Sequence, residues 1–557
     1  MILKRVTKNW SVAPDVKFNR ADFNLSHRVL TSMNPGVLIP LEFEEVLPGD
    51  TINDASTHLV RVSSSFAKPF VGDGFLDTDK FFVPLRLLMK DFEAVFGQVG
   101  LTSWTRKESD YQSIPVTEEA SVVTKGTIAD YLGLPVGTLP TGISILPFRA
   151  FALIWNEWFR NQNVADDVNI SEASTRASSE KVNANAWSST NYFGLCPPVN
   201  RYKDYFTSCL LAPQKGVEFY LDGTQVDPKF IQFVEGSSVD DVWRGTPYWV
   251  WKSGTNVFRE TSGGFMQAGD GTDEGTFIDT NQTGGGDYPI SISNASYHIP
   301  SVNEARLAFQ MQKYLEADAL GGSRYREYIL SHYGVDNGDA RMQIPEFLAG
   351  AHNRINVQQV AATAQTEISG ETYPVGSLAG YSQTVGNKKA HYVKSVTEHG
   401  YIFTVCCIRQ KHDYSQGIAK KWFRQVRTDF YDPKFAFLGF QPVYKHELFG
   451  PSAGALKSTG ILGYQEPYGE LRCGINTVTA GMRPDGSSSL GEVWSIADRF
   501  ASAPNLASLA DETAANLNRV VTVDVSVEDM FIVDTWFDRH AVRILPAYAT
   551  PGLVDHH

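Results

Sequence analysis

Cysteine, long apolar runs and positive charge are all scarce in this chain of 557 residues, and each scarcity argues against a class of protein. The five cysteines are odd in number and form no C-x-x-C pair, so we expect reduced, buried thiols rather than a disulfide framework. No stretch approaches about 18 consecutive apolar residues, and the N-terminal MILKRVTKNW lacks the apolar run of a signal peptide. We therefore expect a protein without a membrane span that folds in a reducing compartment.

The sequence also lacks the motifs of the common enzyme and metal-binding classes. GALKST (454–459) has the wrong spacing for a phosphate-binding P-loop, HELFG (446–450) has no second histidine for a zinc helix, and no G-x-S-x-G is present. The acidic stretch 270–281 misses the register of an EF-hand and is interpreted as a solvated loop. We predict no catalytic residue, no cofactor and no metal site. A β-rich carbohydrate hydrolase, with aromatic residues as sugar platforms, stays open as an alternative.

Lysine and arginine number 49 against 62 aspartates and glutamates, which gives a net charge of −13. A chain with this balance repels nucleic acid when it is taken as a whole. The cations are unevenly placed, however, and residues 1–30 form a basic, irregular stretch that includes Lys4, Arg5 and Lys8. This basic N-terminal arm is either a solvated tail or a contact for a polyanion.

A second basic cluster lies between Arg409 and Arg427 and includes Lys420, Lys421 and Arg424. Aromatic residues are interleaved with these cations. Rings and cations in this arrangement can stack bases and bind phosphates, or they can cover the edge of a core or an interface. A cytoplasmic nucleic-acid-binding protein that works through this cluster is therefore a second alternative.

Aromatic residues make up 12% of the chain, and the segment PFRAFALIWNEWFRNQN (147–163) is dense in them. Its rings recur at helical spacing and predict a helix over 147–161 with one aromatic face. The same segment carries Arg149, Glu157 and Arg160, more polar groups than a plain core helix needs. A second helix is predicted over 301–319, where Ser301 and Glu304 form a capping box.

Strand-like runs are short and far apart along the chain. They cover 36–53, 57–66, 75–88, 399–410 and 529–545, with a turn at Pro48, Gly49 and Asp50 and a short helix after Pro84. Long loops, rather than regularly alternating helices, separate these runs. The order therefore excludes a βαβ series and favours an antiparallel sandwich with large loops.

Residues 217–300 differ from the rest of the chain because they are rich in glycine and acidic residues. This composition indicates an excursion from the main fold, made of loops and short strands. The block also contains four clustered aromatic residues: Trp243, Tyr248, Trp249 and Trp251.

Several sequence blocks together are similar to one protein family. They are FNLSHRVLTSMNPGVLIP, LDTDKFFVPLRLL, RAFALIWNEWFRNQN, DYFTSCLLAPQKG, EARLAFQMQKYLEADALGGSRYREYILSHYGV, ARMQIPEFLAG, EHGYIFTV and PAYATPGLVDHH. In these blocks the chain resembles the major capsid protein of microviruses, in particular the gokushovirus branch of small single-stranded DNA phages. The blocks run from near residue 23 to the last residue, whereas the block 217–300 matches no quoted block, as the resemblance implies for a position that holds a variable insertion in this family.

The resemblance implies a mainly β, single-domain protein over residues 1–557: an eight-stranded antiparallel viral jelly roll with long loops, a few helices and a large surface insertion. It implies a structural protein rather than an enzyme, with sixty copies in a T=1 icosahedral shell around circular single-stranded DNA. The implied partners are further copies in pentamers and three-fold contacts, an internal scaffolding protein, a pilot protein, a small basic DNA-binding protein and a host surface receptor. The implied location is the virion, after synthesis and assembly in the bacterial cytoplasm.

The resemblance also suggests roles for the residues singled out above. The insertion 217–300 would form a protrusion at the three-fold axis that is implicated in host attachment, with its four aromatic residues in a trimer contact or against a host ligand. Arg149, Glu157 and Arg160 would contact a neighbouring copy, or else stay within one subunit. Because sixty such chains would carry about −780 charges, the cations must be placed asymmetrically or supplied by a partner. We expect Lys4, Arg5 and Lys8 to face the genome or the small basic protein.

Overall fold

The computed structural model describes residues 19–97, 111–118, 121–216, 258–261, 265–268, 302–361, 363, 366–368, 371–373, 375–386, 389–436, 438–450, 460–486, 490–522 and 527–547. For residues 258–261, 265–268, 302–304, 366–368 and 371–373 it describes the backbone alone. These residues divide into two compact units. The first comprises residues 1–213 and 321–557, and the second comprises residues 214–320.

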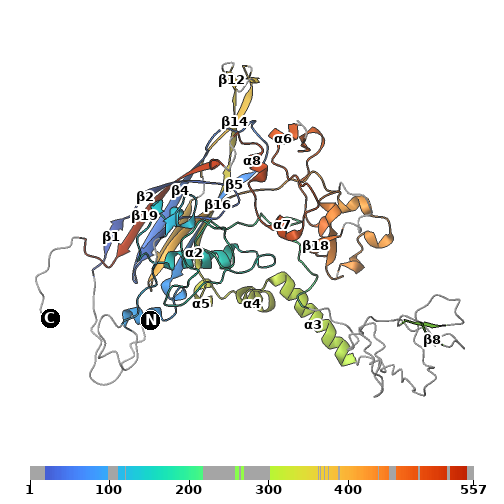
Figure 1. Cartoon of the computed structure of the whole chain (residues 1–557), viewed down its shortest axis with the longest axis horizontal. Helices are drawn as coiled ribbons and strands as arrows, with labels where there is room; N and C mark the ends of the chain where they lie inside the picture. Colours follow the sequence, from blue (N-terminus) through green and yellow to red (C-terminus); the bar gives the residue numbers. More distant parts are fainter. Residues whose placement is uncertain are drawn as a thin grey trace, which may run out of the picture. The chain divides into compact units, whose positions relative to one another are not determined.

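One of the two large sheets in the first unit has seven antiparallel strands (Figure 1). Along one side of the C-terminal strand β19, β2 and β1 pair in succession, and β4 pairs along the other side. Both β15 and β14 pair with the far side of β4, and β11 pairs with β14. The strand bounds are β1 Ala21–Asn24, β2 His27–Met33, β4 Thr51–Val62, β11 Val357–Ala361, β14 Leu378–Val385, β15 Ala390–Ser395 and β19 Phe531–Arg543.

The second large sheet has four antiparallel strands in the order β10-β5-β16-β3. Its central strand β16 carries the almost unbroken apolar run GYIFTVCCI and is buried along nearly its whole length. A continuous apolar run of this kind is typical of a strand covered on both faces. The bounds are β3 Ile39–Val46, β5 Gly74–Pro84, β10 Glu346–Ile355 and β16 Gly400–Gln410.

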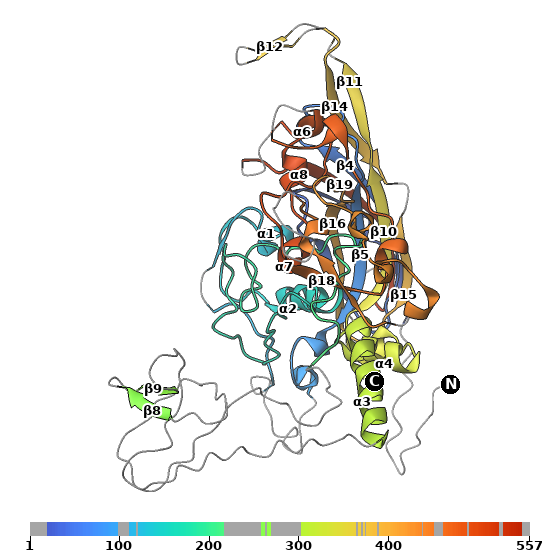
Figure 2. The same ribbon diagram turned by 90° about the vertical axis from the view of Figure 1, so that its right-hand side faces the viewer.

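The main core lies between these two sheets. Strand β4 alternates buried and more exposed residues along its length, which is the pattern of a strand with one face on a core. Met33, Val60 and Val533 of the seven-stranded sheet pack in one cluster with Leu76 and Ile408 of the four-stranded sheet. Figure 2 shows β4 and β19 running beside β16 and β5 in this sandwich.

Buried ion pairs also join the two sheets. Lys80 of β5 binds Asp54 of β4 at 2.7 Å, and both side chains are fully buried. Arg539 of β19 binds Asp54 at 3.3 Å and also pairs with Glu42 of β3. Removing one partner from such a cluster would leave a buried charge uncompensated, so these pairs constrain how the sheets face each other.

A second core lies on the outer face of the four-stranded sheet. Phe81, Phe403 and Val405 of that sheet pack against Phe148 and Phe151 of helix α2 (Leu146–Ile154), together with loop residues. Figure 1 shows α2 beside β16 and β5. The four-stranded sheet is thus the middle of three layers, which explains why β16 needs apolar residues on both faces.

Short elements complete the described structure. The remaining helices are α1 Ile128–Tyr131, α3 Val302–Gly321, α4 Tyr325–Tyr333, α5 Asp339–Met342, α6 Leu490–Trp494, α7 Leu506–Ala510 and α8 Ala515–Asn518. The remaining strands form four small hairpins: β6 Val122–Val123 with β7 Gly137–Thr138, β8 Phe258–Thr261 with β9 Phe265–Ala268, β12 Thr366–Ile368 with β13 Glu371–Tyr373, and β17 Gln441–Tyr444 with β18 Ile461–Gln465. The β12–β13 hairpin lies beyond the end of β14 (Figures 1 and 2).

The predicted mainly β, antiparallel architecture is confirmed, as are all five strand-like runs and both helices. The turn between β3 and β4 uses the expected residues: Gly49 has a φ of +94°, and the Asp50 carboxylate accepts the N–H of Leu47 at 3.1 Å. The prediction of an irregular arm over 1–30 is wrong from Ala21 onward. Residues 21–24 and 27–33 are strands because they pair with β19, which is about 500 residues away in sequence.

Candidate assembly surfaces

The aromatic helix predicted at 147–161 consists of α2 followed by a single π-helical turn, η5 (Trp155–Phe159). Pro147 lies in the first turn, where its missing N–H costs nothing. Almost all of α2 is buried, so its polar residues need partners inside the protein.

Arg149 finds those partners entirely within its own chain. Its side chain is 0% exposed, and it forms a forked pair with Glu180, with N–O distances of 2.6 and 2.9 Å. It also donates to the carbonyls of Leu88 at 3.0 Å and Ala173 at 2.8 Å. Tyr192 donates its hydroxyl proton to Glu180 at 2.6 Å. Arg149 therefore has no surface to offer another copy, and of the two interpretations of this residue the structure supports the one within a single subunit.

The other two polar residues of the segment lie nearer the surface. Glu157 is 3.6 Å from Arg324, and Arg160 donates to the carbonyl of Ala165 at 2.9 Å. Arg324 also binds Glu327 at 3.2 Å and so ties the aromatic helix to α4. Burial raises the pKa of Glu157 even though Arg324 opposes the shift. Both residues are partly exposed, so a contact with another copy stays a prediction for them.

The first part of the second basic cluster is occupied by the chain itself. Arg409 binds Asp77 at 2.8 Å, and its guanidinium lies 4.3 Å from the centre of the Tyr202 ring. Lys411 lies over the ring of Phe75 at 5.4 Å. These contacts hold the outer face of the four-stranded sheet together.

The later part of that cluster forms what we call the basic loop, residues 420–436, built from the short 3-10 turns η6 (Lys420–Phe423), η7 (Arg427–Asp429) and η8 (Pro433–Phe435). Lys420 donates to the carbonyl of Pro442 at 3.4 Å, and Arg424 binds Glu470 at 3.1 Å. Lys421 is exposed, and Trp422 beside it is 77% exposed. Of the three predicted cations, Lys420 and Arg424 therefore bind their own chain. Lys421 faces solvent next to the exposed ring of Trp422.

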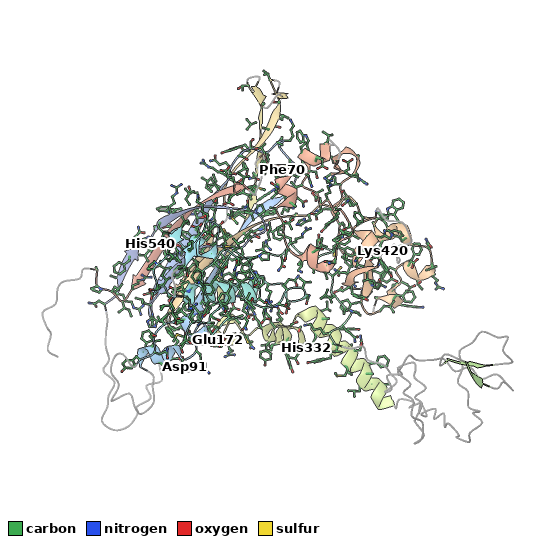
Figure 3. The ribbon with its side chains drawn as sticks, in the orientation of Figure 1. Phe70, Asp91, Glu172, His332, Lys420 and His540 are labelled. Atoms are coloured by element: carbon green, nitrogen blue, oxygen red, sulfur yellow. The ribbon has the colours of Figure 1, made fainter. Side chains whose placement is uncertain are left out.

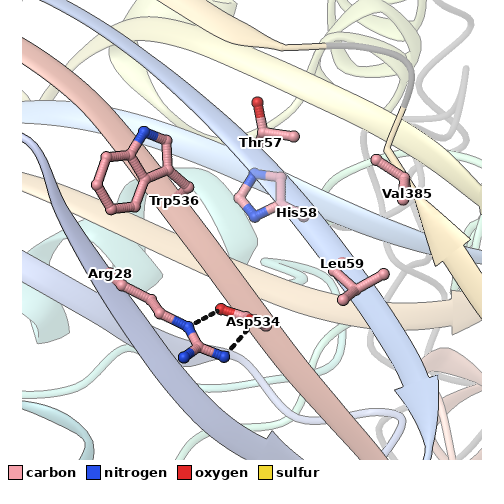
Figure 4. Close-up of a pocket in the computed structure, with 7 residues that line it drawn as sticks. All are labelled: Arg28, Thr57, His58, Leu59, Val385, Asp534 and Trp536. Carbon is pink, nitrogen blue, oxygen red and sulfur yellow. Dashed lines mark hydrogen bonds and ion pairs between the residues drawn. The ribbon is translucent and has the colours of Figure 1, made fainter.

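The outer face of the seven-stranded sheet is a different kind of surface. Arg28 and Trp536 are directly opposite each other on β2 and β19, and Asp534 binds Arg28 with N–O distances of 2.7 and 2.5 Å. Together with Leu59 these side chains border an open depression of about 270 Å³ (Figure 4), which is lined by Arg28, Thr57, His58, Leu59, Val385, Asp534 and Trp536. The His58 ring itself is fully buried on the core side of β4, where it hydrogen-bonds with Thr535 at 2.9 Å and burial lowers its pKa to about 4.

Membrane-spanning helices and metal sites are two classes of feature that the sequence argues against. Within the part of the chain that the structure describes, no helix has the length and apolar character to cross a membrane. Among the same residues, no three or more histidine, cysteine, aspartate or glutamate side chains gather as metal ligands would.

Comparison with known proteins decides the family. The model of the family described as "Capsid protein (F protein)" matches residues 11–553. The chain belongs to this capsid protein family. It is 33% identical over 550 residues to the capsid protein VP1 of Spiroplasma virus 4, across 96% of this chain and 95% of that protein. It is 30% identical over 604 residues to VP1 of Chlamydia phage 1, across 99% and 98%, and 32% identical over 555 residues to VP1 of Bdellovibrio phage phiMH2K, across 97% and 96%.

Membership of the capsid protein family confirms the resemblance found in the sequence blocks. Members of this family are structural proteins of phage particles, so this capsid chain is not an enzyme, and the carbohydrate hydrolase alternative is excluded.

Some predicted site residues of this capsid chain lie outside the described residues. They are the arm cations Lys4, Arg5 and Lys8 and the insertion aromatics Trp243, Tyr248, Trp249 and Trp251. Within the insertion, the structure describes only the backbone of the β8–β9 hairpin.

Sequence reasoning did not single out Trp536 or Arg324 of the capsid chain. A signal for Trp536 was present, because strict alternation along FIVDTWFDRHAVR places this ring on the same face as Asp534 and Asp538, opposite the apolar face. A tryptophan on the polar face of an alternating strand indicates a surface that makes contacts. No comparable local pattern marks Arg324, whose partners are brought together by the tertiary fold.

Proposed function

We propose that this capsid-family chain is the major subunit of a closed T=1 icosahedral shell, in which sixty copies enclose circular single-stranded DNA. Family membership supports the structural role, and the strand order supports the jelly-roll fold that such a subunit would have. The proposal places the protein in the virion after synthesis and assembly in the bacterial cytoplasm.

The order of strands carries the fold part of the proposal. β1 and β2 pair with the same side of β19, and β14 and β15 pair with the same side of β4, so each of these two pairs occupies one position in the seven-stranded sheet. That sheet then has four main strand positions, with β11 at its periphery. The second sheet has four more. Along the chain, β2, β3, β4 and β5 alternate between the two sheets, β10 stays in the second, and β14, β16 and β19 alternate again. A jelly roll has eight antiparallel strands in two facing sheets, and the succession of positions described above supports that fold.

The insertion and the N-terminal arm are the surfaces through which the shell would meet its partners. The insertion 217–300 forms the three-fold protrusion and meets the host receptor, and Trp243, Tyr248, Trp249 and Trp251 hold its trimer contact. The N-terminal arm, through Lys4, Arg5 and Lys8, faces the genome or a small basic DNA-binding protein. Of the predicted DNA contacts in the second cluster, Lys420 and Arg424 bind acceptors of their own chain and Lys421 is exposed, so DNA binding by this cluster is not part of the proposal. An internal scaffolding protein and a pilot protein complete the set of partners.

Electron microscopy and sedimentation of the purified protein test this function. Sixty chains of 61.7 kDa would form a particle of about 3.7 MDa before its DNA is counted. We expect such particles, or five-fold precursors of them, when the chain is produced with its companion proteins. A protein that stays monomeric under these conditions and binds DNA tightly, with steep salt dependence, would instead support the nucleic-acid-binding alternative.

A further inference from the structure

The basic loop displays an unusual concentration of apolar surface. Trp422 is 77% exposed, Val426 57%, Phe430 55%, and Tyr431 51%, and Leu471 on the neighbouring turn is 56% exposed. Scattered exposed apolar residues are normal on a soluble protein, but a contiguous group with tryptophan, tyrosine and arginine is typical of a protein interface.

Contacts within the chain support the part of this group around Phe430, Tyr431 and Leu471. The Arg424 guanidinium lies 5.8 Å from the Phe430 ring centre while it binds Glu470, the residue before Leu471. The Tyr431 ring meets Tyr468 edge-on at 5.3 Å, and the Tyr468 hydroxyl donates to the carbonyl of Thr428 at 3.1 Å. The rings are thus presented on a supported turn, which lowers the entropy lost when a partner binds.

The same loop is basic in an acidic protein. Residues 420–436 contain five cations and two acids, a net charge of +3, so the rest of a chain of net charge −13 carries −16. Two such loops brought face to face would repel each other. Charge repulsion therefore favours a contact in which the loop of one copy meets a different, acidic face of the next, and such a head-to-tail contact forms a ring when its rotation closes. Figure 3 shows Lys420 of the loop on the opposite side of the first unit from His540 of β19, so the unit can carry different contact faces at its two sides.

We propose that the basic loop is one half of a head-to-tail contact between copies of this chain, with Trp422 inserted into an acidic face of the neighbouring copy. This inference rests on the proposed assembly function and deepens it by naming a contact surface. Single-stranded DNA is the less favoured occupant for two reasons. Two of the loop's cations already bind acceptors of their own chain, and the exposed Val426 and Leu471 can neither stack on a base as a ring does nor bind a phosphate.

The first test is the double variant Trp422→Ala/Arg427→Glu in the full chain, made together with the other proteins of the particle. Both side chains are exposed, so the unfolding midpoint of the isolated subunit should shift by no more than about 2 °C. The yield of closed particles should fall about tenfold or more, because an exposed tryptophan and an exposed cation of the loop are lost. The matched control is Val122→Ala/Lys125→Glu, which changes an exposed apolar residue and an exposed cation elsewhere and should assemble normally.

A mixing experiment tests the head-to-tail geometry. A loop-defective subunit still offers its acidic face, so it should join a growing ring and stop it, and a minor fraction of variant should suppress assembly of the wild type. If the loops instead met each other symmetrically, variant subunits would be left out and the wild type would assemble unhindered.

Each outcome has a definite meaning. Normal particle yield from the loop variant overturns the inference, and normal yield with reduced DNA retention would reassign the loop to DNA. A control variant that fails equally also overturns it, because the effect would then not belong to this surface. Absence of particles from the wild type itself would count against the proposed function and would be distinguishable from all of these results.

Discussion

The aromatic helix at residues 146–159 and the basic loop at 420–436 have similar compositions and opposite surroundings. Both interleave rings with arginine, yet Arg149 is fully buried while Trp422 is 77% exposed. Two physical differences separate them. The first segment repeats its rings at helical spacing and so presents one apolar face to a core, whereas the second is broken into 3-10 turns too short to form a face.

The second difference is the partner available to each cation. Arg149 meets a buried carboxylate and backbone carbonyls, which together satisfy its guanidinium. Arg427 lies exposed on its turn. Composition therefore indicates that a segment makes specific contacts, but periodicity and the position of acids decide whether those contacts are inside the chain or outside it.

The strongest test of this comparison removes one arginine from each segment. Arg149→Leu leaves Glu180 as an unpaired buried charge and should lower the free energy of unfolding by about 3–5 kcal/mol. Arg427→Leu, in the basic loop, should change it by less than about 0.5 kcal/mol. Urea unfolding of isolated subunits measures both.

If Arg149→Leu yields no soluble protein, Glu180→Gln serves in its place. It leaves Arg149 without its carboxylate but keeps an acceptor oxygen in place, and the guanidinium retains the carbonyls of Leu88 and Ala173, so it should destabilise the subunit by a smaller but measurable amount. If the variants in both segments lowered the free energy of unfolding by equal, small amounts, the buried Arg149–Glu180 pair would not be the feature that distinguishes the two segments.

A buried charge cluster also lies just before the basic loop, and it should make stability depend on pH. His412 faces Arg201, Asp498 and Glu512, and its ring nitrogens lie 3.0 Å from Asp498 and 3.1 Å from Glu512. Burial lowers the pKa of His412, but the hydrogen bonds to the two carboxylates outweigh it and raise the pKa to about 9, above the ordinary 6.5.

Because the folded-state pKa is raised, the stabilisation is complete below about pH 6.5 and is lost as pH rises through about 9. The size of this contribution is about 3 kcal/mol. We expect the urea midpoint of the wild type to fall across this range, and His412→Gln to remove most of that fall. His540→Gln, on the exposed face of β19, is the control and should keep the wild-type slope. An unchanged slope in His412→Gln would assign the pH dependence to other groups.

Several parts of the fold could be predicted because their signal is local. The alternation in β4, the unbroken apolar run of β16 and the ring spacing of α2 each follow from residues within one element. Strands β1 and β2 could not be predicted in this way, because Arg28 and its basic neighbours give the stretch the composition of a solvated arm. Their strand conformation comes from pairing with β19, and no local pattern reports a partner so far along the chain.

The surfaces were harder to predict than the fold for the same reason. Whether Lys420, Lys421 and Arg424 face solvent depends on where Pro442 and Glu470 lie, and those positions are set by the tertiary structure. The sequence did show that rings and cations gather there. It could not show which cations are already bound.

The smallest expected effect on the fold comes from removing the insertion. Residues 214–320 form a compact unit of their own, and the hydrophobic clusters that join the two sheets and α2 lie in the other unit. Replacing residues 222–297 by a short Gly-Ser linker should therefore leave soluble subunits whose urea midpoint is close to that of the wild type. The comparison replaces residues 164–198, a stretch without helices in the first unit, by the same linker. That change removes the buried Glu180, Tyr192 and Phe193 from the core beside α2, so it should abolish folding. Insoluble protein from the first replacement would show that the insertion takes part in the fold of the sandwich. If both replacements gave soluble protein, the buried loop residues around α2 would contribute less to folding stability than their contacts imply.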